Sequence, residues 1–200
     1  MQQPVYARRS RPAGYCRAGF FLLSTLVTTA VWAKAQSASP ARVDIDNFGQ
    51  INANYYRGGQ PDAAGFAELK HLGIKTVIDL QEDGNPRESG WVRGCGMRYL
   101  NIPLSSKRPA TREQTDYFLG LVNDPRNLPV FVHCAGGRHR TGEMTAIYRI
   151  THDGWTADQA FQEMERYDFY STWGHGSLKD YVFQYYSQLA TPHPSVAQKK

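Results

Sequence analysis

Residues 133–142 have the sequence HCAGGRHRTG and bring a thiol, two arginines and three glycines together within ten positions. A cysteine is nucleophilic as the thiolate, which nearby cations and helix N-termini favour. Glycines let the backbone turn closely around an anion, because no Cβ blocks the approach. We therefore expect an anion-binding loop after Cys134, and its predicted binding residues are Ala135, Gly136, Gly137, Arg138, His139 and Arg140.

The chemistry that suits this loop is the transfer of a phosphoryl group to sulfur. A thiolate at Cys134 can attack phosphorus and form a cysteinyl-phosphate, which water then hydrolyses. The planar fork of Arg140 can hold two phosphoryl oxygens and their developing charge. Thr141 can donate a hydrogen bond to the departing sulfur, and His139 titrates in a range that suits proton transfer. Cys134, Arg140, Thr141 and His139 are the predicted catalytic residues.

The flanking elements also favour an anion site. The loop follows a predicted buried strand at residues 129–133 and precedes a predicted helix at residues 143–152. In α/β proteins, ligands bind beyond the carboxyl ends of the strands. The N-terminus of the following helix adds the positive end of its dipole.

The rest of the chain alternates between strand and helix patterns. Short β-prone runs predict strands at residues 55–57, 76–80 and 98–102, and apolar spacing predicts helices at residues 66–72, 111–122, 157–166 and 178–189, with a loop at residues 84–90. This alternation predicts an α/β fold with a mainly parallel central sheet flanked by helices.

Residues 1–35 differ in composition from the rest of the chain. Four arginines precede or flank the start of an apolar run at residues 18–33, and Ala33-Lys34-Ala35 fits a signal-peptidase site. This order predicts a signal peptide, and hence a secreted or periplasmic protein without a membrane span after cleavage. The alternative is an uncleaved membrane anchor, although the run is short for a span. We expect a linker at residues 36–47, a folded domain at 48–190 and a flexible tail at 191–200.

Charge and cysteine content limit which partners and which disulfides we expect for the mature chain. Five of the 23 lysines and arginines precede Gln36, and the remaining 18 equal the 18 aspartates and glutamates. A neutral domain does not predict a nucleic-acid-binding surface. Cys95 and Cys134 could pair, although a disulfide would disable a nucleophilic Cys134. We expect a monomer without a cofactor. We also expect no metal site, because the histidines and cysteines show no zinc-ligand spacing.

The pattern His-Cys-x2-Gly-x2-Arg-Thr-Gly resembles the signature of the protein tyrosine phosphatase superfamily, whose core is Cys-x5-Arg. Residues 55–61, YYRGGQP, resemble a tyrosine-arginine-small-x-x-proline segment of the atypical dual-specificity phosphatases of plants, fungi and bacteria. Residues 72–80 resemble the helix-to-strand step that follows it. The likeness covers residues 48–189 and implies a dual-specificity phosphatase-like fold.

This resemblance implies a cysteine-dependent phosphatase of the protein-tyrosine or dual-specificity type. Its implied substrates are phosphotyrosine in phosphoproteins, or inositol polyphosphates and phosphoinositides. His133 takes the place of the family's loop-shaping histidine. Arg138, with Lys107 and Arg108, would add cations for a substrate with several phosphates, or would form a solvated basic rim.

The family usually places an aspartate on an upstream loop to protonate the leaving group. The matching segment here, residues 102–109, contains no carboxylate. His139, Asp116 and Glu143 are the candidate substitutes. A general acid contributes about two to four orders of magnitude in rate. Its absence favours one alternative, a catalytically weak, phosphate-binding pseudophosphatase. Sulfur transfer or thiol redox chemistry at Cys134 is a third hypothesis, although Arg140 makes phosphate the better ligand.

Overall fold

The computed structural model describes residues 43–190, which lie within one compact unit. Its central sheet has the strand order β1-β2-β5-β3-β4 among the described residues. The β1–β2 pair is antiparallel, and the three other pairs are parallel. The strands are β1 (Gly49–Asn52), β2 (Tyr55–Gly58), β3 (Thr76–Gln81), β4 (Arg98–Leu104) and β5 (Val130–His133). The predicted α/β fold with a mainly parallel sheet is confirmed.

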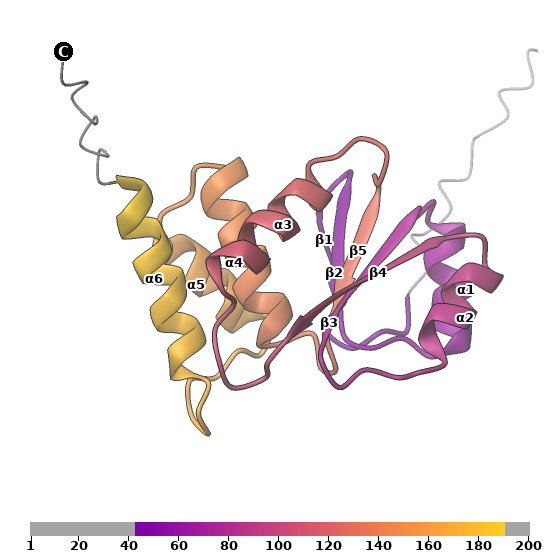
Figure 1. The fold of residues 1–200 in the computed structure, drawn as a ribbon, viewed down its shortest axis with the longest axis horizontal. Coiled ribbons are helices and arrows are strands. Elements are labelled where there is room, and N and C mark those ends of the chain that lie inside the picture. The colour runs from indigo at the N-terminus through magenta and orange to yellow at the C-terminus, as the bar shows by residue number, and fades with distance from the viewer. Residues whose placement is uncertain (1–42, 191–200) are drawn as a thin grey trace, which may run out of the picture. The chain divides into compact units, whose positions relative to one another are not determined.

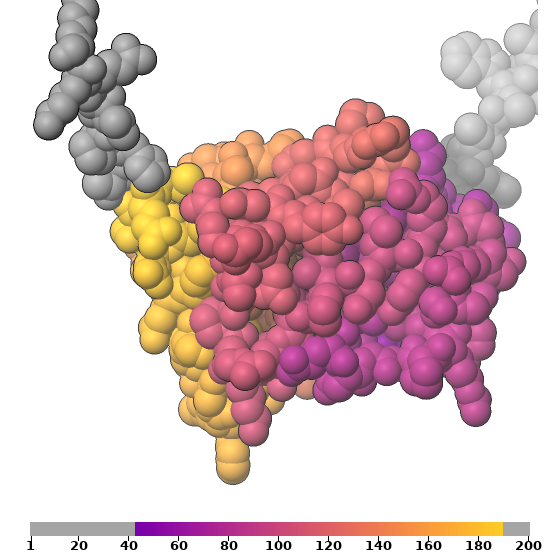
Figure 2. Space-filling view, in the orientation of Figure 1, coloured from indigo at the N-terminus to yellow at the C-terminus, as the bar shows by residue number. Residues whose placement is uncertain are grey.

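Helices cover both faces of this sheet (Figure 1). They are α1 (Ala63–His71), α2 (Glu88–Gly94), α3 (Arg112–Val122), α4 (Arg140–His152), α5 (Ala157–Arg166) and α6 (Gly176–Ala190). Helices α1 and α2 pack on one face, and α4 packs on the other face with α3, α5 and α6 around it. Side chains fill the spaces between these ribbons, as the space-filling view in Figure 2 shows.

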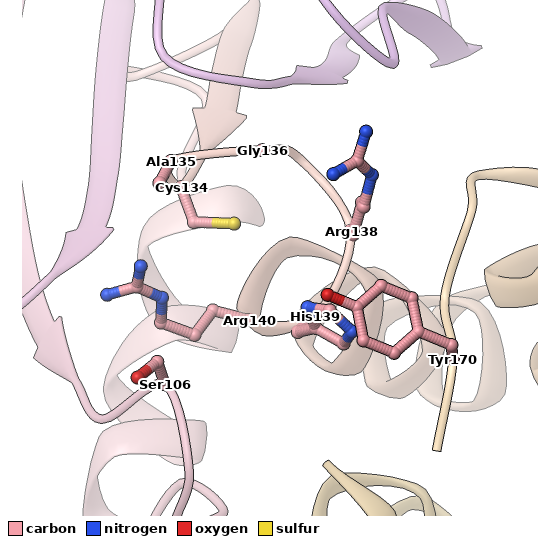
Figure 3. Close-up of a pocket in the computed structure, with 8 residues that line it drawn as sticks. All are labelled: Ser106, Cys134, Ala135, Gly136, Arg138, His139, Arg140 and Tyr170. Carbon is pink, nitrogen blue, oxygen red and sulfur yellow. The ribbon is translucent and has the colours of Figure 1, made fainter. Parts of the chain in front are cut away.

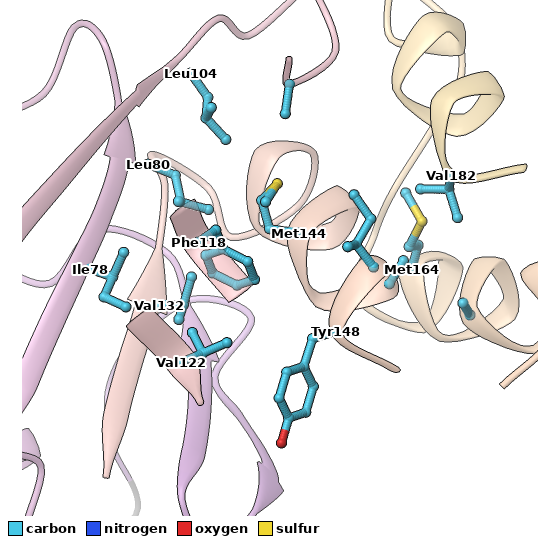
Figure 4. Packing of buried hydrophobic residues seen from close by; sticks show 14 of the residues in the cluster. Ile78, Leu80, Leu104, Phe118, Val122, Val132, Met144, Tyr148, Met164 and Val182 are labelled. Carbon is cyan, nitrogen blue, oxygen red and sulfur yellow. The ribbon is translucent and has the colours of Figure 1, made fainter. Parts of the chain in front are cut away.

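Side-chain alternation along the strands divides the core between the two faces. In β3, Val77 packs with α1 and α2, whereas Ile78 packs on the α4 side. In β5, Phe131 faces α1 and α2, whereas Val132 faces α4. Successive residues of a strand point to opposite faces, so a continuous apolar run is needed to bury both. Figure 4 shows the α4 side of this core.

The strand register gathers three chain segments at one edge of the sheet. Gly58 at the end of β2 and Asp79 in β3 both pair with His133 at the end of β5. The segments that follow β2, β5 and β3 therefore emerge side by side at the carboxyl edge. This arrangement brings residues 59–61, 82–87 and the loop after Cys134 together.

The structure differs from the sequence predictions at several boundaries. Residues 88–90 begin helix α2 rather than completing a loop, because Glu88 and Val92 are buried. The folded chain also begins before Phe48, since Ile45 packs in the core beside α1. Helix α4 begins at Arg140, three residues before the predicted start, which places Arg140 in its first turn.

The predicted signal peptide and the flexible tail lie outside the described residues, as does most of the predicted linker. Within residues 43–190, no helix combines the length and apolarity that crossing a membrane requires.

Candidate active site

The loop between β5 and α4 forms one wall of a small pocket (Figure 3). The pocket holds about 110 Å³. In Figure 3 the sulfur of Cys134 is directed into the space between the side chains of Arg138 and Arg140. Cys134 is 3% exposed, so its thiol is reached through this pocket. The lining residues are Ser106, Cys134, Ala135, Gly136, Arg138, His139, Arg140 and Tyr170.

Three consecutive carbonyl groups of the loop are held by donors from outside it. The carbonyl of Ala135 accepts from the backbone N–H of Gln60 at 3.0 Å. The carbonyl of Gly136 accepts from Asn47 Nδ2 at 2.8 Å, and that of Gly137 accepts from Arg57 Nη2. A trans peptide directs its N–H opposite to its carbonyl. The next three N–H groups are therefore directed away from these outer donors, as an anion-binding loop requires.

Gly137 allows the loop to approach the end of β2 closely. Its φ is +67°, and a Cβ there would lie 2.5 Å from the carbonyl carbon of Gly58. A left-handed φ costs a residue with a side chain roughly 1–3 kcal/mol, and the backbone contact adds to this cost.

We expect Gly137→Ala to lower the free energy of unfolding by at least about 2 kcal/mol, measured by chemical denaturation. The matched control is Gly136→Ala, because a Cβ at Gly136 meets no atom closer than 3.5 Å. Equal stability of the two variants would contradict the close packing of the loop against β2.

Arg140 is fixed by contacts on one side of its guanidinium. Its Nη1 donates to Asp83 Oδ1 at 2.9 Å and to the carbonyl of Leu104 at 3.4 Å. The Arg140 side chain is 6% exposed, whereas that of Asp83 is 67% exposed. The hydrogen bond from Arg140 lowers the pKa of Asp83 below its usual value, so the carboxylate stays ionised. The edge formed by Nε and Nη2 carries no protein hydrogen bond among the described residues and remains available to a ligand.

Arg138 is the second cation of the pocket. Its Nε lies 3.8 Å from Asp168 Oδ2, and both side chains are largely exposed. A pair of this kind contributes little to stability, so Arg138 can exchange its partner for a phosphate. Lys107 and Arg108 are exposed on the loop after β4. That loop is tied to the pocket, because His175 Nδ1 donates to the carbonyl of Ser106 at 2.9 Å.

His139 lines the pocket within a stack of rings. Its ring lies parallel to that of His175, with centroids 3.6 Å apart, and meets the Tyr170 ring edge-on at 4.4 Å. Burial, together with the neighbouring His175, lowers the pKa of His139 to about 4. The free protein therefore holds His139 at neutral pH in the form that accepts a proton rather than the form that donates one.

The other two candidate acids lie away from the pocket. Asp116 pairs with Arg112 at 2.9 Å on the exposed side of α3. Glu143 is buried and accepts from the backbone N–H of Ala110 at 2.9 Å. Burial raises the pKa of Glu143 to about 8, so it is largely protonated at neutral pH. Neither residue lines the pocket, and no carboxylate does among the described residues.

His133 has a distant partner rather than a local backbone one. Its Nε2 lies 2.7 Å from Glu88 Oε1, and both side chains are fully buried. Asp79 completes a group whose oxygen and nitrogen atoms lie within 4.8 Å of one another, which is a spacing that could hold a metal ion. Hydrogen bonds already occupy these atoms, since Asp79 accepts from Tyr99 Oη at 2.8 Å and Glu88 accepts from Gln60 Nε2 at 2.9 Å. The group therefore serves as a hydrogen-bond network beneath the loop.

The structure also describes Thr141 and the two cysteines of the predicted domain. Thr141 Oγ1 is buried without a hydrogen-bond partner, so it makes no bond to the sulfur in this structure. Cys95 and Cys134 are both free thiols.

The sequence prediction missed Asp83 and Tyr170, and it did not place His175 against His139. Asp83 follows the end of β3, where the carboxyl edge of a parallel sheet favours functional residues, and this position was its available signal. Tyr170 and His175 lie between α5 and α6, far along the chain from the loop. Nothing in the local sequence places them beside His139.

Sequence comparisons relate the chain to known phosphatases. A family described as "DSP-PTPase phosphatase fused to NAD+ Kinase" matches residues 28–179. The dual specificity protein phosphatase TpbA of Pseudomonas aeruginosa (strain UCBPP-PA14) is 31% identical over 153 residues, which cover 76% of this chain and 69% of that protein. The inositol diphosphatase DSP4 of Arabidopsis thaliana is 28% identical over 134 residues, which cover 60% of this chain and 63% of that protein.

Solved structures share the fold. A cysteine-to-serine variant of P. aeruginosa TpbA in complex with phosphotyrosine aligns with a TM-score of 0.54 and 27% identity, covering 80% of this chain and 99% of that chain. The core catalytic domain of the PP-IP phosphatase SIW14 from S. cerevisiae aligns with a TM-score of 0.63 and 22% identity, covering 70% and 86% of the two chains.

Proposed function

Because this chain belongs to the DSP-PTPase family of cysteine-dependent phosphatases, we propose that Cys134 is its nucleophile and that Arg140 grips the phosphoryl group. The observation that carries this proposal is the shared pocket. The Cys134 sulfur and the Arg140 side chain line one small cavity, and the loop around it has three carbonyls bound from outside. Such a cavity suits a tetrahedral anion.

In the proposed reaction, Cys134 attacks phosphorus as the thiolate. The phosphorus–oxygen bond of the ester breaks as the sulfur–phosphorus bond forms, and the leaving oxygen departs with the bonding electron pair. Arg140 binds two phosphoryl oxygens through its free Nε and Nη2 edge while Asp83 holds Nη1. Water then cleaves the cysteinyl-phosphate, which releases phosphate and restores the thiolate.

The pocket supports a substrate with a good leaving group. No carboxylate lines it among the described residues, and His139 is neutral at neutral pH. A leaving group that is a weak base, such as an aryl alcohol or the phosphate released from a diphosphate, departs without a proton more readily than an alkyl alcohol does. Phosphotyrosine and inositol diphosphates meet this requirement. Phosphotyrosine is the ligand in one solved structure of similar fold, and another relative is named an inositol diphosphatase. Arg138 would bind a second phosphate of a polyphosphate substrate.

The test is phosphate release from para-nitrophenyl phosphate and from an alkyl phosphate, each with and without orthovanadate and a metal chelator. We expect hydrolysis of the aryl ester, inhibition by vanadate and no effect of the chelator. An aryl alcohol needs less protonation than an alkyl one, so the aryl ester should react about two or more orders of magnitude faster. Activity that the chelator abolishes and vanadate leaves intact would reject the cysteinyl-phosphate mechanism.

We also propose that the enzyme is exported and acts as a monomer. The proposed leader, residues 1–35, supports export by its charge and apolar pattern. Mass spectrometry of the expressed protein should find Gln36 at the N-terminus, and light scattering should find one chain per particle. An intact leader retained in the membrane would support the anchored alternative instead.

A further inference from the structure

Arg57, at the end of β2, is a fully buried arginine directly behind the phosphate-binding loop. Its side chain is 0% exposed. Its Nη2 donates to the carbonyl of Gly137, while Nε and Nη1 are buried without a hydrogen-bond partner. The guanidinium lies over the ring of Tyr167, 3.9 Å from the ring centroid. No carboxylate of the described residues forms an ion pair with it.

A buried cation without a counter-charge is costly. Removing an ion from water costs several kcal/mol even after the protein relaxes. Burial lowers the pKa of Arg57, but a guanidinium remains protonated in proteins. Proteins therefore keep such a charge only beside a compensating anion or ring face, or where it serves the site.

The groups that could carry negative charge near Arg57 differ in whether another cation already neutralises them. Its electrostatic neighbours are Tyr55, Tyr167, Cys134 and Glu163. Burial raises the pKa of Tyr55 far above its ordinary value, so that phenol is neutral. Glu163 is held by Arg149 at 2.7 Å, and Tyr167 contributes the face of its ring. The remaining neighbour is Cys134, the proposed nucleophile, together with any phosphoryl group that the loop binds.

We propose that Arg57 is a positioning residue whose buried charge stabilises the Cys134 thiolate from behind the loop, while its bond to Gly137 holds the loop in its anion-binding form. The inference rests on the proposed function of Cys134. Arg57 does not line the pocket, so it acts through the loop and through space rather than by touching the substrate. Arg140 grips the phosphoryl group from the pocket side, and Arg57 supplies positive charge on the opposite side of the loop.

The test measures ionisation of the Cys134 thiol without turnover. The full chain is treated with iodoacetamide at a series of pH values, and alkylation of the peptide that contains Cys134 is followed by mass spectrometry. Only the thiolate reacts, so the rate reports its fraction. In Arg57→Met, we expect the pH midpoint of alkylation to rise by about 1 unit, which slows the reaction about tenfold at pH values well below both midpoints. Arg57→Lys, which keeps the charge, should stay close to the wild-type midpoint.

Two further variants keep the result decisive. Arg112→Met removes an arginine whose partner is Asp116 on the exposed side of α3, and should leave the midpoint unchanged. Should Arg57→Met fail to fold, Arg57→Gln takes its place, because its neutral side chain keeps a hydrogen-bond donor. The inference is overturned if the neutral variants alkylate at the wild-type midpoint, or if Arg57→Lys shifts as far as they do. A failure of the proposed function would appear separately, as turnover that survives without the Cys134 thiol.

Discussion

Replacing Cys134 with serine is expected to abolish phosphate release from an aryl phosphate, with a loss of at least about three orders of magnitude in kcat. A serine hydroxyl keeps nearly the same shape but remains protonated at neutral pH, so no anion is available to attack phosphorus. Binding should survive, because the loop carbonyls and Arg140 do not depend on the sulfur. A rise in the melting temperature on adding phosphate would measure this binding.

The control for this prediction is Cys95→Ser, which removes the other free thiol of the described residues. Cys95 lies at the end of α2, outside the pocket, and its replacement should leave kcat near the wild-type value. Phosphate release by Cys134→Ser at a rate close to that of Cys95→Ser would reject Cys134 as the nucleophile. Binding of phosphorylated ligands without turnover by the wild type would favour the pseudophosphatase alternative.

Replacing Arg140 with lysine should produce the second-largest effect, a fall of about two to three orders of magnitude in kcat/KM. A lysine keeps one positive charge but loses the planar fork, so it cannot hold Asp83 on one side and two phosphoryl oxygens on the other. Steady-state kinetics with an aryl phosphate measures the loss. Because the fork can follow the redistribution of charge over the equatorial phosphoryl oxygens in the transition state, we expect much of the loss in kcat.

Arg138→Lys is the matched control, since it makes the same change two positions earlier in the loop. The Arg138 side chain is 41% exposed and its partner Asp168 lies 3.8 Å away, so a lysine can fill the same role. Its kcat/KM for an aryl phosphate should fall by less than about tenfold. Similar losses in the two variants would mean that the loop needs positive charge generally and not the fork of Arg140.

The local sequence predicted the loop because its chemistry is contiguous. Cys134, Gly136, Gly137 and Arg140 lie within seven positions, and a buried strand and a helix flank them. The continuous apolar run that leads into His133 also predicted a buried strand, and the structure confirms that all four residues of β5 are buried. Patterns of this kind depend on short-range geometry, so they can be recognised without knowledge of the rest of the fold.

The helix α2 shows where local patterns were insufficient. Residues 84–90 contain glycines and a proline, which predict a loop, yet the helix begins at Glu88. Burial of Val92 against α1 and the bond from Glu88 to His133 stabilise this short helix. Both interactions are tertiary, so the local propensity of the segment could not reveal them.

The sequence by itself predicted Cys134 as the nucleophile, Arg140 as the cation that follows it and the mainly parallel sheet that carries them, because these predictions depend on neighbouring residues and on strand and helix periodicity. Only the tertiary structure decided which groups surround them. Asp83 reaches Arg140 across 57 positions, and Arg57 reaches Gly137 across 80. These contacts exist because β5 lies between β2 and β3, so that the segments after the three strands emerge together at one edge of the sheet. Strand order is a property of the folded chain, and no local pattern encodes it.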